Sequence, residues 1–194
     1  MLRLTKWRRV RSNHTMPKYV AFLRAINVGG HTVKMDHLRD LFAGLGFRNV
    51  ETFIASGNVI FDSTSKSVQA LEKKIESCLL EALGYDVATF IRSTTQIADI
   101  AQHKPFPDSE LSDAGHVLYI GFMAGEPTET AKEKLLSLTT EVDDFHLNGR
   151  EIYWLRRTKF SESKISGTLL AKTLGLPATL RNSTTIRRLA AKYS

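Results

Sequence analysis

Hydrophobic positions recur with two different periods along the chain, and the changes of period predict its secondary structure. Lys18–Ala25 is apolar nearly throughout, as in a buried strand. Apolar residues then recur at helical spacing in Met35–Leu45 and Val68–Ala82, and Gly46 and Gly84 are expected to end these two helices. Three shorter β-rich runs complete this half: Val50–Ala55 and Val59–Asp62, on either side of a tight turn at Ser56-Gly57-Asn58, and Asp86–Ile91. The predicted order of elements is βαββαβ.

The second half of the chain repeats this order. Its predicted hairpin turn, Asn148-Gly149, is the strongest short-range hairpin signal that a sequence carries. A helix that ends at Gly175, a short strand and a last helix follow the hairpin. The predicted elements are His116–Met123, Thr128–Leu138, Asp144–Leu147, Glu151–Leu155, Ile165–Leu174, Ala178–Leu180 and Thr184–Lys192. No residue-level repeat accompanies the repeated order.

The repeated order predicts an α+β protein of two tandem ferredoxin-like (βαββαβ) units, pseudo-duplicated, with an extra C-terminal helix. Each unit would form a four-stranded antiparallel sheet with both helices on one face. Two such units could cover each other's open faces. Residues 102–114, which include two prolines and three acidic residues, are expected to link a first unit at 16–101 to a second unit at 115–194.

Residues 1–15 lack this periodicity and are predicted to be a disordered basic extension. They contain five basic residues and no acidic one, and they lack the apolar core of a secretory signal. Three interpretations stay open. The segment is a basic arm that contacts nucleic acid, a short organelle presequence, or the result of a start assigned upstream of Met16.

The composition is that of an ordinary globular protein, with 42% hydrophobic and 24% charged residues. No apolar run approaches the roughly 18–20 residues that a membrane-spanning helix needs. The single cysteine, Cys78, excludes an intrachain disulfide and a cysteine-based zinc cluster. Together with the missing secretory signal, these features predict a cytoplasmic protein.

The net charge of +7 is distributed unevenly. Residues 1–16 carry +5, residues 17–149 carry −6 and residues 150–194 carry +8. A basic end beside an acidic middle indicates either an anionic partner at the basic end or attraction between the two halves.

Several short motifs follow one another in a characteristic order: LRAINVGG at 23–30, SGNVIF at 56–61, and then Tyr-Trp-Leu at 153–155, Ser-Lys-Ile at 163–165 and Leu-Arg-Asn at 180–182. Together they resemble the bacterial domain of unknown function 1697 family, from about Lys18 to the C-terminus. The resemblance implies a tandem of ferredoxin-like units and no known reaction. The family pattern has glycine where this chain has Ala25 and tryptophan where it has Ser183, so a family site that depends on that tryptophan would be altered here.

The end of the first strand is one candidate anion site. Arg24 lies directly before a glycine-containing loop that leads into a helix. Backbone N–H groups at Gly29 and Gly30, with Asn27 beside them and a helix N-terminus nearby, favour a phosphate or a carboxylate. The alternative is that Arg24 pairs with an acidic residue of the other unit and that the glycines only turn the chain. The loop matches neither the Walker A pattern nor G-x-G-x-x-G.

Three further places carry candidate ligand-binding residues. Ser56 and Asn58 lie at the hairpin turn of the first unit, and Lys164 lies at the start of the second helix of the second unit. Arg181 and Asn182 precede the last helix, whose N-terminus Asn182 is also suited to cap. These residues are predicted to converge with Arg24 on one anion pocket between the units.

The last helix is basic as well as amphipathic. Arg187, Arg188 and Lys192 lie apart from the apolar side of the helix, which contains Ile186 and Leu189. This pattern suits either contact with nucleic acid or a solvated surface.

No residue stands out as a general base or a nucleophile, so no catalytic residue is predicted. No metal ion and no cofactor is predicted either, because the six histidines are scattered and no nucleotide motif occurs. The favoured interpretation is a non-enzymatic module that binds an anionic ligand, either nucleic acid or a nucleotide-like phosphate, between the two units. The alternatives are a small-metabolite enzyme with Arg24 and Lys164 as anion clamps, and an oligomeric scaffold.

Overall fold

The computed structural model describes residues 16–27, 30–54, 57–157 and 163–193. The basic extension predicted over residues 1–15 lies outside the described residues.

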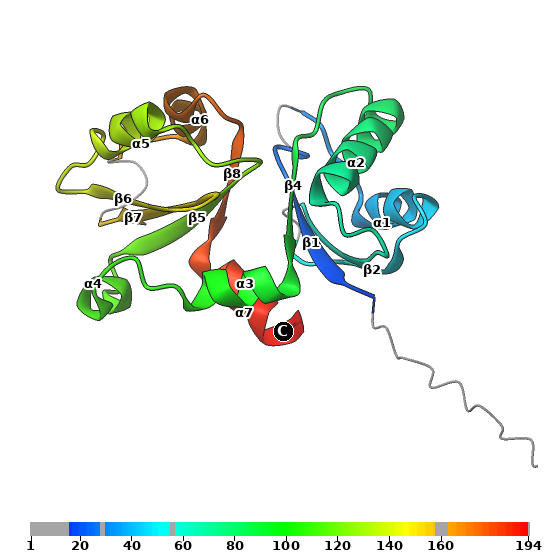
Figure 1. Ribbon diagram of the computed structural model, residues 1–194, viewed down its shortest axis with the longest axis horizontal. Coiled ribbons are helices and arrows are strands. Elements are labelled where there is room, and N and C mark those ends of the chain that lie inside the picture. The colour runs from blue at the N-terminus through cyan, green and yellow to red at the C-terminus, as the bar shows by residue number, and fades with distance from the viewer. Residues whose placement is uncertain (1–15, 28–29, 55–56, 158–162, 194) are drawn as a thin grey trace, which may run out of the picture.

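The first half forms a four-stranded antiparallel sheet with two helices on one face (Figure 1). Its strands lie in the order β2-β3-β1-β4. The last strand, β4, starts at Thr89, three residues later than predicted, and Val87 before it packs into the core on the helix side of this sheet. The elements are β1 Lys18–Leu23, α1 Met35–Gly44, β2 Arg48–Thr52, β3 Asn58–Asp62, α2 Val68–Leu83 and β4 Thr89–Ser93.

The second half forms another four-stranded antiparallel sheet, in the order β6-β7-β5-β8, also with two helices on one face (Figure 1). The predicted α+β class is therefore confirmed, with a second core on the helix side around Trp154, Leu135 and Leu170. The elements are β5 Val117–Met123, α5 Glu129–Leu136, β6 Asp143–Asn148, β7 Glu151–Arg156, α6 Gly167–Leu174 and β8 Ala178–Asn182.

Glycines end two of the predicted helices as expected. Gly84 and Gly175 cap α2 and α6 in the left-handed conformation, with φ of 78° and 64°. Glycine adopts this backbone region without a steric penalty. Gly149, with φ of 57°, forms the turn of the β6–β7 hairpin that Asn148-Gly149 predicts.

Within the described part of the chain, three helices lie outside the two sheet-and-helix layers: α3 Thr94–Gln102, α4 Asp108–Ser112 and α7 Ser183–Tyr193. The sequence analysis does not predict α3, which Ser93 and Gln96 begin with a reciprocal capping box. The segment predicted as a linker contains α4. Figure 1 shows α3 and α7 packed together beside the boundary between the two sheets. The division into units at 16–101 and 115–194 stays a prediction.

The open faces of the two sheets meet in a third, shared core. Phe22 of β1 stacks on Phe122 of β5, with ring centroids 3.9 Å apart. Ile97 of α3 and the apolar side of α7, with Ile186 and Leu189, close this core. Burial of these apolar surfaces therefore holds the two halves together.

Ala25 has an unusual backbone conformation in the turn that follows β1. Its φ is 54°, and its side chain is exposed. The left-handed conformation costs a residue with a Cβ atom roughly 1–2 kcal/mol. This cost explains why the resembled family pattern has glycine at this position.

Replacing Ala25 with glycine should raise the free energy of unfolding by about 0.5–1 kcal/mol, because the relieved strain exceeds the added freedom of the unfolded chain. Urea denaturation measures the change. The matched control is Ala43→Gly, at an exposed position of α1, which should lower the free energy of unfolding by about 0.5–1 kcal/mol. An Ala25→Gly protein that is less stable than the parent would contradict the strain argument.

Candidate functional site

Arg92 of β4 reaches from the first sheet to the second. Its side chain is only 1% exposed. Its Nε donates a hydrogen bond to Glu151 Oε1 at 2.6 Å, and Nη2 donates to the backbone carbonyls of Met123 and Arg150. Nη1 donates to the carbonyl of the preceding residue, Ile91. This buried guanidinium is tolerated because its charge is paired and four of its five N–H donors form hydrogen bonds.

Arg181 of β8 reaches in the opposite direction, from the second sheet to the first. Its Nε donates to Asn58 Oδ1 at 2.6 Å, and Nη2 donates to the carbonyls of Leu23 and Gly57. Nη1 donates to the carbonyl of the preceding residue, Leu180, and to Thr179 Oγ1. All five N–H donors of this guanidinium are therefore accepted by oxygen atoms of the protein.

The two arginines occupy equivalent positions in the two sheets. Arg92 pairs with Val20 of β1, and Arg181 pairs with Ile120 of β5. Their acceptors are also equivalent, since Asn58 pairs with Phe22 and Glu151 pairs with Phe122. Each guanidinium lies 5.6 Å from the ring centroid of one of these two phenylalanines, Arg92 over Phe122 and Arg181 over Phe22. We call Arg92, Glu151, Arg181 and Asn58 the arginine clasp.

The two sides of the clasp differ in charge. Glu151 gives Arg92 a carboxylate partner, whereas Asn58 gives Arg181 a neutral amide oxygen. Burial lowers the pKa of Arg181 to about 10, because burial disfavours the charged form. Burial also lowers the pKa of Arg92, and the charge of Glu151 opposes that shift. At neutral pH both guanidinium groups stay charged.

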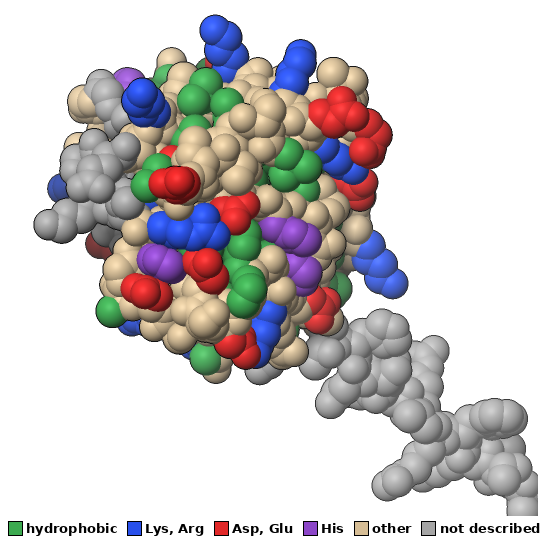
Figure 2. Space-filling view, turned by 90° about the vertical axis from the view of Figure 1, so that its left-hand side faces the viewer, with side chains coloured by type: hydrophobic (Ala, Val, Ile, Leu, Met, Phe, Trp, Pro, Cys, Tyr) green, Lys and Arg blue, Asp and Glu red, His purple; other side chains and the backbone are tan. Residues whose placement is uncertain are grey.

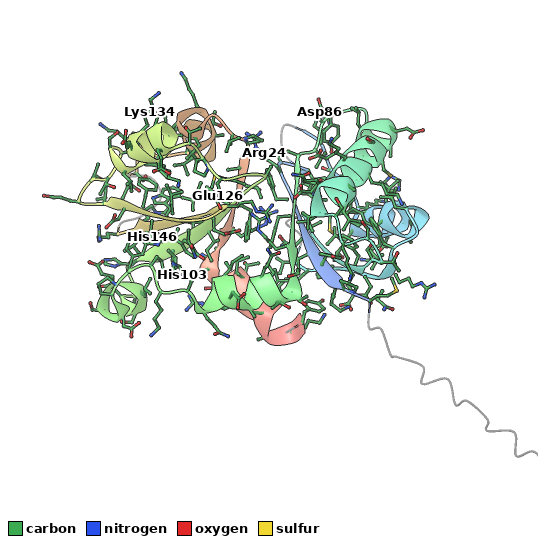
Figure 3. All side chains as sticks on the ribbon, in the orientation of Figure 1. Arg24, Asp86, His103, Glu126, Lys134 and His146 are labelled. Atoms are coloured by element: carbon green, nitrogen blue, oxygen red, sulfur yellow. The ribbon has the colours of Figure 1, made fainter. Side chains whose placement is uncertain are left out.

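The clasp brings two of the predicted site residues together, Arg181 and Asn58. Arg24 lies next to them along the backbone, because the Leu23 carbonyl that accepts from Arg181 belongs to the Leu23–Arg24 peptide. The Arg24 side chain is half-buried, and none of the described carboxylates lies within ion-pair distance of it. Figure 3 shows Arg24 at the upper edge of the boundary between the sheets.

The other predicted residues are placed separately. Asn27 Oδ1 accepts a hydrogen bond from the Val33 backbone N–H at 2.7 Å, which closes the loop. Gly30 is exposed, with φ of 88°. Lys164 is exposed beside Ile165, which belongs to the helix-side core of the second sheet. Asn182 caps the start of α7 by accepting from the Thr184 backbone N–H at 2.8 Å. Gly29 and Ser56 lie outside the described residues.

A cavity of about 920 Å³ lies at the first turn of α7, and we call it the α7 cavity. Asn182, Ser183, Thr184 and Arg187 form its α7 wall. The opposite wall is the end of α3 and the following segment, which includes Lys104 and α4, and strands β5 and β7 contribute Leu118, Ile120 and Leu155. Its volume is within the range of small-molecule sites.

The charged groups of the α7 cavity do not all have partners. Lys104 pairs with Asp108 at 2.9 Å. Glu110 pairs with Arg157 at 2.9 Å and lies 3.3 Å from His116 Nδ1. Arg187 donates to Ser183 Oγ at 3.0 Å, and within the described ranges no carboxylate pairs with it. The cavity therefore carries one cation that no described anion neutralises.

The outward face of the second half shows acidic, basic and histidine side chains close to one another (Figure 2). Among the described residues visible in this view, basic side chains alternate with acidic ones and form no extended basic patch of the kind that binds nucleic acid through phosphate contacts. Among the described residues no cluster of three metal-ligating side chains occurs, and none of the described helices is long and apolar enough to cross a membrane.

Sequence analysis does not predict Arg92, although the sequence carries a signal for it. Ile-Arg-Ser-Thr-Thr at 91–95 resembles Leu-Arg-Asn-Ser-Thr-Thr at 180–185, and both segments lead from a strand into a helix. This similarity marks Arg92 and Arg181 as equivalent residues. It corrects the expectation that the repeated order of elements has no residue-level counterpart.

A model of the protein family described as "Protein of unknown function (DUF1697)" matches residues 16–153. The match confirms the family resemblance predicted from the motifs. Among solved structures, the chain is similar to the conserved bacterial protein SP0830 from Streptococcus pneumoniae. The two are 24% identical with a TM-score of 0.71, and the alignment covers 93% of this chain and 100% of that one. This likeness shows the fold alone. No curated protein matches the chain.

Replacing Arg92 with methionine should lower the free energy of unfolding by about 3–5 kcal/mol, because Glu151 would stay buried without its cation. Arg181→Met should lower the free energy of unfolding by less, about 1–3 kcal/mol, because the acceptors that it leaves unpaired are neutral. Urea denaturation at neutral pH compares the two variants.

The double variant Arg92→Met/Glu151→Met provides the control, since it removes both charges of one side of the clasp. It should be more stable than Arg92→Met alone. The charge argument is wrong if Arg181→Met lowers the free energy of unfolding as much as Arg92→Met does. It is also wrong if the double variant is no more stable than Arg92→Met.

Proposed function

We propose that this chain, which belongs to the DUF1697 family of proteins of unknown function, binds a small ligand with a phosphate or carboxylate group in the α7 cavity. The observation that carries the proposal is Arg187, a cation on the cavity wall that none of the described carboxylates pairs with. An anionic ligand would supply the missing charge.

The start of α7 supports the same chemistry. The N-terminus of a helix carries a partial positive charge and backbone N–H groups that suit an anion. The first turn of α7 contains no acidic residue that would offset this charge. Ser183 and Thr184 add hydroxyl groups to the same wall. Arg187 follows one turn later on the helix, so its guanidinium and the helix terminus favour one and the same anion.

The acidic residues of the α7 cavity do not oppose an anion strongly. Asp108 and Glu110 each have a basic partner, Lys104 for the first and Arg157 for the second. Their charges are therefore largely compensated before a ligand enters. Of the residues predicted from sequence to bind the anion, Asn182 lines this cavity.

The clasp is a less suitable place for the anion. Arg181 uses all five of its donors on protein oxygen atoms, so a ligand would have to displace one of these hydrogen bonds. We assign the two cationic regions separate roles: the clasp joins the sheets, and the α7 cavity binds the ligand.

We further propose that each half is a ferredoxin-like unit, that the two arose by tandem duplication, and that the protein acts in the cytoplasm. The strand orders β2-β3-β1-β4 and β6-β7-β5-β8 and the equivalent arginines support the first two points. The ligand site then lies between the units, because α3 precedes the segment predicted as the linker and α7 ends the second unit.

Replacing Arg187 with glutamine should weaken binding of a phosphate-bearing compound about tenfold or more, because a charge-assisted hydrogen bond contributes about 1.5–3 kcal/mol. The measurement is the rise in melting temperature with added inorganic phosphate and nucleoside 5′-monophosphates at constant ionic strength. The unliganded melting temperature should change little, since Arg187 is an exposed residue.

Arg188→Gln is the matched control, with the same change of charge one residue further along α7. Arg188 lies 5.7 Å from the ring centroid of Phe53 and does not line the cavity. It should retain the stabilisation by phosphate. Equal losses in both variants would indicate nonspecific attraction, and an absence of stabilisation by any phosphate compound would refute the proposal.

A salt titration with mixed RNA and DNA separates a small ligand from a polymer. Binding to a nucleic acid backbone weakens steeply with salt, because each neutralised phosphate releases counterions. Binding in the α7 cavity involves one anionic group and should show a much shallower dependence.

A further inference from the structure

A second cavity, of about 440 Å³, adjoins the α7 cavity, and we call it the α3 cavity. It lies between α3 and the β6–β7 hairpin. The two cavities share Ile100, Gln102 and His103 in their linings. The two cavities therefore adjoin at the C-terminal end of α3.

Tyr153 of β7 lines the α3 cavity, and its hydroxyl group is buried without a hydrogen-bond partner among the described residues. The residue is 1% exposed, and no other described residue forms a hydrogen bond with its phenolic oxygen. Burying a hydroxyl group without a partner costs about 1–3 kcal/mol, so such groups are rare in folded proteins. The hydroxyl of Tyr153 is thus a binding group without an acceptor or donor of its own.

Two histidines lie against Tyr153. The His103 ring centroid is 4.8 Å from that of Tyr153 and 5.3 Å from that of His146. His103 Nε2 is also buried and unpaired in the part of the chain that the structure describes. Figure 3 shows His103 and His146 on the same half of the molecule, away from Arg24. The residues that carry these two unpaired atoms, Tyr153 and His103, thus both line the α3 cavity, and the His146 ring packs beside them.

The first sheet shows that the fold does not require this cluster. The residue equivalent to Tyr153 is the apolar Ile60, since the two pair with the equivalent residues of β5 and β1. On the neighbouring edge strand, His146 lies opposite Tyr153 and Glu51 lies opposite Ile60. Glu51 has partners, since its carboxylate accepts from Lys192 at 2.9 Å and from the Tyr193 hydroxyl. An apolar side chain and an ion pair therefore suffice for packing.

Burial favours the uncharged forms of Tyr153 and His146. Burial raises the pKa of the Tyr153 hydroxyl, which stays protonated as a donor. Burial, together with neighbouring His103, lowers the pKa of His146. The amides of Gln96, Gln102 and Asn148 also line the α3 cavity, as do the charged side chains of Arg92, Asp99, Arg150 and Glu151. Neutral donors and acceptors beside ring faces suit a planar heterocycle with hydrogen-bonding edges, which proteins bind by stacking and by hydrogen bonds to those edges.

We propose that the α3 cavity receives the base of a nucleoside phosphate, held by Tyr153 and His103, while the phosphate lies at Arg187 in the α7 cavity. The phosphate half rests on the proposed function, whereas the base half rests on the unpaired groups of the α3 cavity. The lining residues that the two cavities share, Ile100, Gln102 and His103, place the two halves of this ligand side by side.

Calorimetric titration of the full chain tests the base half. The four nucleoside 5′-monophosphates, the four nucleosides and ribose 5-phosphate are compared at one ionic strength. At least one monophosphate should bind about tenfold or more tightly than ribose 5-phosphate, because the base adds hydrogen bonds and ring contacts. A 5′-phosphorylated trinucleotide that binds more tightly still would identify the end of an RNA chain as the source of the nucleotide.

Tyr153→Phe removes the hydroxyl alone. It should weaken binding of that monophosphate about tenfold, leave the affinity for ribose 5-phosphate unchanged, and keep or raise the unliganded melting temperature. A merely structural tyrosine would show no such dependence on the base. Tyr119→Phe is the control, because Tyr119 packs on the helix side of the same sheet and its hydroxyl accepts from Arg156. It should change neither affinity.

Three outcomes separate the two proposals. Phosphate compounds that bind through Arg187 with no advantage of any nucleotide over ribose 5-phosphate would overturn the inference and leave the proposed function standing. Nucleosides that bind through Tyr153 while the phosphate adds nothing would support the base site and overturn the proposed anion site. Absence of binding by every compound would overturn both.

Discussion

Each sheet of this chain has two helices on one face, and its other face is buried by the opposite sheet together with α3 and α7. Apolar burial supplies the attraction, with Phe22 stacked on Phe122, but apolar contacts are non-directional and do not fix the position of one sheet relative to the other. The arginine clasp does fix this position. Arg92 and Arg181 must each reach carbonyl groups at fixed positions of the opposite sheet, and a shift of one residue would leave buried guanidinium donors unpaired. The clasp therefore fixes how the sheets meet, and with it the positions of α3, α7 and the cavities between them.

Local patterns predict the elements of this fold because each element obeys a short-range rule. Gly84 and Gly175 end helices through their left-handed conformation, and Asn148-Gly149 closes a hairpin. The hydrophobic pattern does not predict α3, because this helix has only two buried residues, Ile97 and Ile100, and lies next to a segment rich in proline and acidic residues. It owes its stability to α7 and the shared core more than to its own periodicity.

The candidate site was less accessible to sequence reasoning, for a physical reason. Arg181 and Asn58 could be selected as polar residues at strand ends, yet their contact spans the boundary between the sheets and depends on the pairing of Phe22 with Asn58. His103 and Tyr153 belong to a helix end and to the middle of a strand, which no local motif connects. Ala25 is the opposite case, since one departure from a family pattern corresponds to one backbone angle, a φ of 54°. Local strain can be anticipated from sequence, whereas contact between distant polar groups requires the fold.

The near-equivalence of the two sheets makes their differences informative. Contact between the sheets requires an arginine and a hydrogen-bond acceptor from each sheet, and these residues lie at equivalent positions of the two sheets. Where only packing is required, the first sheet has Ile60 and the Glu51–Lys192 ion pair. The second sheet has Tyr153 beside His146 and His103, and the Tyr153 hydroxyl and His103 Nε2 have no hydrogen-bond partner among the described residues. Stability alone favours the first arrangement, because it leaves no buried polar atom without a partner. The second arrangement carries a cost that a ligand would offset, and it lies beside the cavity where Arg187 has no described anion to pair with. The buried unpaired atoms of Tyr153 and His103 thus lie close to the unpaired charge of Arg187, beside the second sheet of a nearly symmetric molecule. A ligand that bound there would gain the most binding energy.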